Sequence, residues 1–256
     1  MARYAELLPE QLDLLWQQNA PAILPWGALE WHGAHLPLGL DGIVATWFAE
    51  QLAAQTSGVL LPGVWLPMTT LPHRHSLQVR TETLRMVLDD VIAGLYESGA
   101  RRICLISGHY AQGHQVEMSE AALRAMDDNP GLLVLSGAPL EPLRDDRMLD
   151  HAGQFETSEL LAIRPDLVHL ENLTEDVPTA HDSAVIGERP TRGSASEGQA
   201  LLESALTAWT EWIQDASFER LEAHHKSVFD RYTPYIDAYY RGSWEDAMTA
   251  WWAEKG

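Results

Sequence analysis

Cysteine, basic side chains and long apolar runs are all scarce in this sequence of 256 residues. The single cysteine, Cys104, has no partner for an internal disulfide, which favours a reducing compartment. Seventeen Lys and Arg stand against thirty-seven Asp and Glu, and the formal net charge is −20. Binding to nucleic acid or to anionic membranes depends on basic side chains, so this balance argues against both kinds of partner. The acidic surface instead favours solubility.

Targeting and membrane signals are also missing. Residues 1–15 contain no apolar run of the roughly 7–15 residues that a signal peptide needs. No stretch reaches the roughly 18 apolar residues of a membrane span. We therefore expect a cytoplasmic protein.

The composition is that of a globular chain, with 46% hydrophobic and 21% charged residues. Segments typical of buried strands alternate with segments typical of helices. We expect strands at 22–26, 59–61, 64–66, 103–106 and 132–135, and helices at 43–54, 83–98 and 115–126. This alternation predicts a single α/β domain over residues 1–256, with a mostly parallel central sheet flanked by helices.

Two segments stand apart from this alternation. Residues 171–198 are rich in Pro, Gly, Ser and Thr, and a loop of this length is a candidate cover for a functional site. Residues 201–256 are expected to extend a core at about residues 20–200 with helices. Aromatic side chains crowd this extension: Trp209, Trp212, Phe218, Phe229, Tyr232, Tyr235, Tyr239, Tyr240, Trp244, Trp251 and Trp252. Packing on the sheet or on another subunit would explain them, and so would stacking against a ligand.

Histidine and carboxylate side chains form three clusters, two directly after predicted strands and one at a predicted helix start. The clusters are Glu30, His32, His35 and Asp41; then His109; then His151 and Glu156. Ligands of open α/β sheets bind beyond the carboxyl ends of the strands. Imidazole and carboxylate together suit Zn²⁺, Mn²⁺ or Fe²⁺, and a carboxylate can bridge two ions about 3.5–4 Å apart. A lone histidine at a strand end is more often a hydrogen-bonded core residue, but three glycine-flanked clusters favour a metal site.

The same clusters carry a resemblance to a known family. The stretch EWHGAHLPLGLD at residues 30–41 resembles the EQHGPHLPLGTD signature of the creatininase family of metal-dependent amidohydrolases. SGHY at 107–110 resembles that family's N-G-H-[GY] motif, and HAGQFETS at 151–158 resembles its H-[AG]-G-x-x-E-T-S motif. The order and separation of the motifs agree from about residue 20 to 200. The resemblance therefore implies a creatininase-like fold for most of the chain.

The resemblance also implies a binuclear metal site that holds Zn²⁺ or Mn²⁺, with Fe²⁺ as a further option. The implied ligands are Glu30 and His109 for one ion, His32 and Glu156 for the other, and Asp41 between them. Two such cations acidify a water that attacks a carbonyl group. His151, with a pKa near neutral, would then protonate the leaving group. The family further implies a homo-oligomer, a hexamer, in which the aromatic C-terminal segment contacts a neighbouring subunit.

The resemblance places further side chains near a small-molecule substrate: His35, His73, His75 and Tyr110. For His35, a structural hydrogen bond is an equal alternative. Creatininase itself has a Glu at the position of Ala111, which argues against creatinine as the substrate. The motif of His109 also begins with Ser107 rather than Asn, and QVRT at 78–81 replaces the family's FPGT segment.

Three functions therefore remain open. The first is hydrolysis of the C–N bond of a small cyclic or linear amide. The second is opening of a cyclic polyol ketone of the dehydro-inosose type, at a C–C bond and at the same metal site. The third is a metal-binding protein without catalysis.

Overall fold

The computed structural model describes residues 1–143, 150–173 and 183–241, and for 234–241 it describes the backbone alone. The strands are β1 (Ala2–Arg3), β2 (Ala22–Trp26), β3 (Val59–Leu60), β4 (Arg102–Ser107) and β5 (Leu133–Gly137). The α-helices are α1 (Pro9–Gln17), α2 (Leu40–Thr56), α3 (Thr81–Glu97), α4 (Gln112–Asp128), α5 (Gln154–Ile163), α7 (Ala195–Gln214) and α8 (Phe218–Arg241). Among the described residues, no helix is both long enough and apolar enough to cross a membrane.

The strands form one five-stranded sheet in the order β1-β3-β2-β4-β5. All of its pairings are parallel, with Ile23 beside Cys104 and Cys104 beside Leu135 at its centre. The central strands are apolar on both faces because helices cover both. The predicted α/β class with a parallel central sheet is confirmed.

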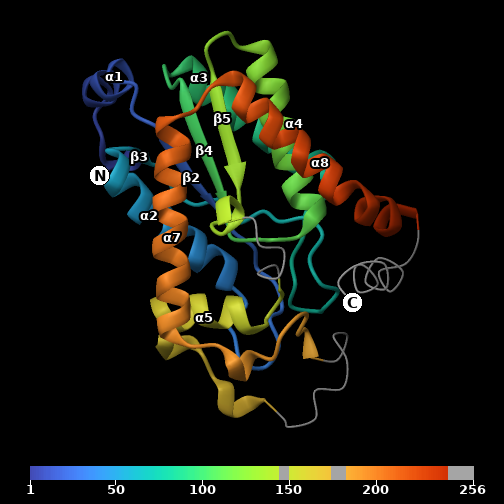
Figure 1. Cartoon of the computed structure of the whole chain (residues 1–256). Helices are drawn as coiled ribbons and strands as arrows, with labels where there is room; N and C mark the ends of the chain where they lie inside the picture. The colour runs from blue at the N-terminus through green and yellow to red at the C-terminus, as the bar shows by residue number, and fades with distance from the viewer. Residues whose placement is uncertain (144–149, 174–182, 242–256) are drawn as a thin grey trace.

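Helices cover the two faces in the pattern that right-handed crossovers dictate. The chain moves from β2 to β3 through α2, and in the opposite direction from β3 to β4 and on to β5 through α3 and α4. Accordingly α2 packs with α7 on one face, while α3 packs with α4 on the other (Figure 1). Helix α8 lies along α4 and reaches β5.

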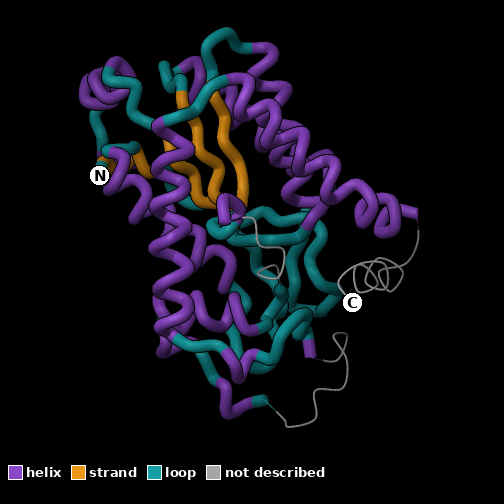
Figure 2. The backbone as a smooth tube through the Cα atoms, in the orientation of Figure 1, coloured by secondary structure: helices purple, strands orange, loops and turns teal. Residues whose placement is uncertain are grey.

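The position between β2 and β4 is the point at which the sheet changes its winding direction. These neighbouring strands send their following helices in opposite directions, and open α/β sheets bind their ligands beyond the carboxyl ends of the strands at such a point. Figure 2 shows the loops gathered at this end of the strands. Glycines let the chain close in there, because a Cβ on Gly108 would overlap the carbonyl oxygen of Asp41. The start of α2 is thereby brought against the end of β4.

Several predicted boundaries need correction. Residues 64–66 do not form a strand, since Val64 makes only an isolated bridge to Trp26. Prolines at 62 and 67 remove the backbone donors that a continued ladder would need. Helix α2 begins at Leu40 rather than at 43, so that Asp41 is part of its first turn. The loop predicted to reach residue 198 ends earlier, because Ser194 caps the start of α7 by accepting a hydrogen bond from the Glu197 N–H.

Most of the described aromatic residues of the C-terminal extension serve packing. Trp209 is fully buried, donates its indole N–H to the Pro139 carbonyl at 2.9 Å and meets Phe48 of α2 edge to face. Tyr232 is buried, Trp212 and Phe229 are partly buried, and Phe218 is 36% exposed. The packing interpretation therefore holds for these residues except Phe218, which is exposed. The remaining aromatic side chains lie outside the described residues: Tyr235, Tyr239, Tyr240, Trp244, Trp251 and Trp252.

Two buried histidines of α8 cover the outer edge of β5, the last strand of the described sheet. His224 Nε2 donates to the Ser136 carbonyl and His225 Nε2 donates to the Val134 carbonyl, each at 2.9 Å. An uncovered edge strand exposes such carbonyls for pairing with another chain. Burial and the neighbouring His224 lower the pKa of His225 to about 3, so the ring is neutral in the folded chain.

We expect His225→Phe to lower the free energy of unfolding by about 1–3 kcal/mol at neutral pH, because the Val134 carbonyl stays buried without its donor. Wild-type His225 takes up a proton on unfolding below about pH 6.5, so its contribution is complete above that pH and is lost as the pH falls towards 3. The difference between variant and wild type should therefore shrink towards about pH 5 in urea titrations. His169→Phe, at an exposed histidine, is the control. Equal stabilities of His225→Phe and wild type at neutral pH would contradict the role of this hydrogen bond.

Candidate metal centre

Five of the predicted side chains meet beyond the ends of β2 and β4. His109 Nδ1 lies 3.0 Å from Glu30 Oε2 and 3.2 Å from Asp41 Oδ2. His32 Nε2 lies 3.0 Å from Asp41 Oδ1 and 3.6 Å from Glu156 Oε2. The two oxygens of Asp41 thus face two different histidines.

The chemistry of this cluster fits divalent cations. All five residues are at most 3% exposed. Four of their buried atoms have no hydrogen-bond partner: Glu30 Oε2, His32 Nε2, Asp41 Oδ1 and Asp41 Oδ2. Bonds of about 2.0–2.2 Å to one ion would hold neighbouring ligand atoms about 3.0–3.5 Å apart, close to the separations here. The atoms form one group of Glu30, Asp41 and His109 and another of His32, Asp41 and Glu156, which share Asp41.

Backbone groups orient these side chains from behind. His109 Nε2 donates to the Met68 carbonyl at 2.9 Å, and His32 Nδ1 donates to the Glu30 carbonyl at 3.1 Å. The other oxygen of Glu30 accepts from the Leu71 N–H. Because each ring uses one nitrogen in this way, its second nitrogen is left for the centre.

The charges of the cluster shift the pKa values of both histidines upward. Burial is the largest influence and lowers the pKa of His32, but Asp41 and Glu156 outweigh it and raise the value to about 10. Burial also lowers the pKa of His109, but Glu30 and Asp41 outweigh it and raise the value well above the usual one. A cation bound here would displace a proton from each ring, because the neutral imidazole is the ligand.

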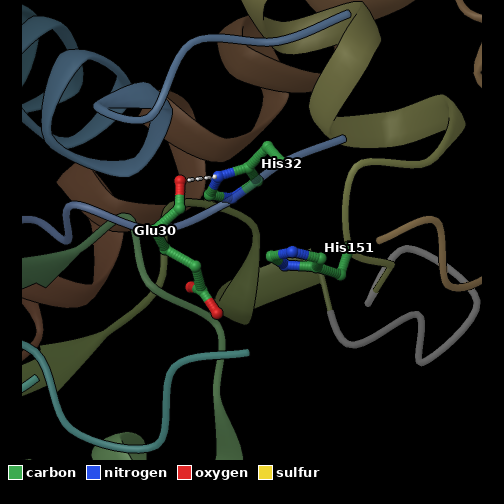
Figure 3. Close-up of side chains that lie close together, drawn as sticks. All are labelled: Glu30, His32 and His151. Carbon is green, nitrogen blue, oxygen red and sulfur yellow. Dashed lines mark hydrogen bonds between the residues drawn. The ribbon is translucent and has the colours of Figure 1, made fainter. Parts of the chain in front are cut away.

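His151 lies beside this cluster and forms a third candidate group with Glu30 and His32 (Figure 3). Its ring stacks on that of His32 with 4.3 Å between centroids, and its Nε2 donates to the Trp31 carbonyl at 3.0 Å. Burial, followed by the charge of His32, lowers the pKa of His151 to about 4. This value differs from the near-neutral one expected from the sequence, because partial burial and the charge of His32 both disfavour the protonated ring. The ring of His151 is therefore neutral at neutral pH.

The residues predicted to contact a substrate are placed differently from one another. His35 is fully buried, and its Nε2 lies 3.3 Å from Thr157 Oγ1 of α5. This contact is of the kind expected if His35 makes a structural hydrogen bond rather than a substrate contact. His73 stacks on Trp31 at 4.5 Å between ring centroids, and His75 is exposed beside it. Both therefore lie at the surface next to the backbone that holds His151.

Tyr110, the fourth of these residues, directly follows His109 and is half-buried. Its hydroxyl donates to Glu159 Oε1 at 3.4 Å. Glu159 was not predicted from the sequence. Its place three residues after Glu156, on the same face of α5, is the signal that could have found it.

His114 was missed as well. It is fully buried in the first turn of α4 and its Nδ1 accepts from the Met68 N–H at 3.5 Å, behind the carbonyl that holds His109. His114 lies outside the three motifs that predicted the site.

The described part of the predicted cover lies against the site. Ile186 exchanges backbone hydrogen bonds of 2.8 and 3.0 Å with His151. A Cβ on Gly33 would overlap the Ser183 carbonyl, so Gly33 lets this segment approach closely. Residues 174–182 of the same segment lie outside the described part of the chain.

Fold and site together define a parallel α/β protein with a candidate metal centre at the switch point of its sheet. The Creatininase family model, described as creatinine amidohydrolase, matches residues 5–213. The chain belongs to the creatininase family, as its motifs predicted.

Curated relatives of the chain carry three different activities by name. Creatinine amidohydrolase of Pseudomonas putida is 29% identical over 182 residues, 61% of this chain and 69% of that protein. 3-Dehydro-scyllo-inosose hydrolase of Thermotoga maritima is 26% identical over 176 residues, 61% and 54% of the two chains. Mycofactocin precursor peptide peptidase of Mycobacterium tuberculosis is 25% identical over 223 residues, 75% and 85% of the two chains. All three are hydrolases.

Solved structures agree on the fold. "Creatininase Mn" superposes with a TM-score of 0.74 at 22% identity, over 84% of this chain and 98% of that chain. A creatininase variant of "Zn-Zn type" gives 0.73 at 22% identity, over 83% and 97%. Helix α8 lies outside the match to the family model, which ends at residue 213.

Proposed function

We propose that this protein is a metal-dependent hydrolase that cleaves the C–N bond of a small cyclic or linear amide with two divalent cations. The observation that carries the proposal is the geometry of Asp41, whose two oxygens face two separate histidine–carboxylate groups. Zn²⁺ and Mn²⁺ are the candidates by ligand chemistry, and both are named for structures of the same fold.

The protein would hold the ions through Glu30, His109 and Asp41 on one side and through His32, Glu156 and Asp41 on the other. Two cations at these positions would polarise a carbonyl group and lower the pKa of a water. His151 would move the proton. With Nε2 committed to the Trp31 carbonyl, Nδ1 is the atom that accepts the proton and then gives it to the leaving nitrogen.

The names of two relatives favour an amide over the other substrates. Relatives at 29% and 25% identity are an amidohydrolase and a peptidase by name, and both names denote cleavage of a C–N bond. Creatinine itself is disfavoured because Ala111 offers no carboxylate where creatininase has one.

The second candidate function is the opening of a cyclic polyol ketone. A relative at 26% identity is a 3-dehydro-scyllo-inosose hydrolase by name, although the aligned part spans 54% of that protein. The products separate the two functions, since the ketone reaction forms an acid and releases no amine. The third function, metal binding without catalysis, is excluded by turnover of any substrate.

A screen of the Zn²⁺- and Mn²⁺-supplemented protein tests the proposal. Lactams, formamides, short peptides and inososes should be compared, with released amine and acid measured separately. We expect amine and acid in equal amounts from at least one amide. Acid from an inosose without amine would favour the ring-opening function, and the absence of turnover throughout would favour the third.

The assembly of the protein is a further part of the proposal. From the aromatic C-terminal segment and the family resemblance we expect a homo-oligomer, a hexamer, in the cytoplasm. Deletion of residues 243–256 should shift the mass measured by light scattering towards smaller species and reduce activity, although every candidate ligand is kept. A monomeric mass for the intact chain would contradict this prediction.

A further inference from the structure

Residues 68–71 form the backbone behind one half of the candidate metal centre. The Met68 carbonyl accepts a hydrogen bond from His109 Nε2 at 2.9 Å, and the Leu71 N–H donates to Glu30 Oε1. Both supported side chains belong to the same one of the two groups that share a bridging carboxylate. The direction of these two candidate ligands therefore depends on the shape of this segment.

The segment is strained at its second residue. Thr69 has a φ of 59°, in the left-handed region that a β-branched residue rarely adopts. Its hydroxyl donates to the Met68 carbonyl at 2.6 Å, and Gly113 of α4 makes room for it, since a Cβ there would lie 3.0 Å from Thr69 Cγ2. A strained backbone keeps its shape only where its surroundings hold it, and such strain is often found at functional sites.

His114 holds the start of this segment from behind. It is fully buried in the first turn of α4, and its Nδ1 accepts a long hydrogen bond of 3.5 Å from the Met68 N–H. Its ring also meets that of His109 edge to face, with 5.2 Å between centroids.

The cost of burying this ring is not offset by packing alone. Because the Met68 N–H is the donor, His114 Nδ1 carries no proton, and the proton of the ring is on Nε2. Nε2 is buried and finds no hydrogen-bond partner among the described residues. An unpaired buried donor destabilises a fold, so His114 needs a further explanation.

We propose that His114 is a positioning residue that anchors residues 68–71, so that Glu30 and His109 stay aimed at one ion. The inference rests on the metal binding of the proposed function, and His114 is itself no candidate ligand. It acts through the backbone of Met68, which it holds at the N–H while His109 is held at the carbonyl.

The other half of the centre is supported by different groups. His32 Nδ1 donates to the Glu30 carbonyl at 3.1 Å, and Glu156 Oε2 accepts from the Ala152 N–H at 2.6 Å. Loss of the anchor at His114 should therefore weaken the binding of one ion and spare the other.

Two substitutions of His114 separate anchoring from packing. His114→Phe keeps a ring but has no acceptor for the Met68 N–H, whereas His114→Asn keeps an acceptor oxygen near the position of Nδ1 and loses most of the ring. Zn²⁺ should be titrated into the metal-free proteins against a competing chelator, and wild type should bind two ions. We expect His114→Phe to bind one ion about tenfold more weakly and the other as wild type does, since groups that orient ligands change metal affinity by about 10–100-fold. His114→Asn should bind both ions nearly as wild type does.

Thermal unfolding of the metal-free proteins supplies the readout that packing governs. His114→Phe fills the space and removes the unpaired donor, so its midpoint should lie near that of wild type, whereas the cavity in His114→Asn should lower the midpoint. Metal affinity and stability are thus expected to fall in different variants. His225→Phe, at a buried histidine of α8, is the control and should lose stability without a change in affinity for either ion.

An affinity that follows stability, with His114→Asn binding Zn²⁺ more weakly than His114→Phe, would show a packing role and overturn the proposal. Unchanged affinity in His114→Phe, or an equal weakening of both ions, would overturn it too. Failure of the proposed function gives different results. Wild type without bound Zn²⁺ would contradict the metal centre and the inference together, whereas two bound ions without turnover of any amide would contradict the hydrolysis alone, and the titrations would still decide on His114.

Discussion

Asp41→Ala is expected to remove both ions from the protein and to abolish its turnover. Each oxygen of Asp41 lies close to a different histidine, at 3.0 Å from His32 and 3.2 Å from His109. These distances are about those between two ligand atoms of one ion. The substitution therefore takes a ligand from both groups at once, and each loses the charge that offsets its cation. Elemental analysis of the gel-filtered protein should give close to two ions per chain for wild type and close to none for the variant.

Two companion variants sharpen this result. Asp127→Ala removes an exposed carboxylate in the last turn of α4 and should leave the metal content unchanged. Asp41→Asn keeps one oxygen and should hold at most one ion. An undiminished metal load in Asp41→Ala would remove the bridging role of Asp41.

The sequence predicted the meeting of the site residues from the place of their motifs after strands and from the family resemblance, and the topology of the sheet explains why Glu30 and His109 meet. Two glycine-flanked motifs that follow strands of one parallel sheet must come together if those strands are neighbours, and β2 and β4 are neighbours. The separation of Glu30 from His109 along the chain was therefore no obstacle. The position of Asp41 was less evident, since it depends on α2 beginning at Leu40 and on the missing Cβ of Gly108.

Other parts of the site and fold leave little trace in the sequence. The supports of the centre are mostly backbone groups, such as the Met68 carbonyl and the Leu71 N–H, and a backbone group carries no residue-type signal. The pKa of His151 depends on burial that only the packed structure determines. Strand β1 was not predicted because two residues are too short for a periodic pattern.

His151 is the residue at which metal content and turnover are expected to separate most clearly. His151→Ala should keep about two ions per chain, because the ring lies outside both groups that share Asp41 and holds the Trp31 carbonyl instead. Turnover should fall roughly 10²–10⁴-fold, the usual contribution of a proton-transferring group. Added imidazole should restore part of it, since the substitution leaves a space of the same shape beside His32.

His109→Ala is the matched variant, because it removes an equally buried imidazole from the same site. It should lose the ion held with Glu30 and Asp41 together with turnover, and imidazole should restore turnover only when the ion returns. His169→Ala, at an exposed histidine, should change neither quantity. If His151→Ala bound less metal while His109→Ala kept all of it, the two histidines would have exchanged roles. The proton-transferring base would then be His109, which lies beside Glu30 and Asp41 at the end of β4.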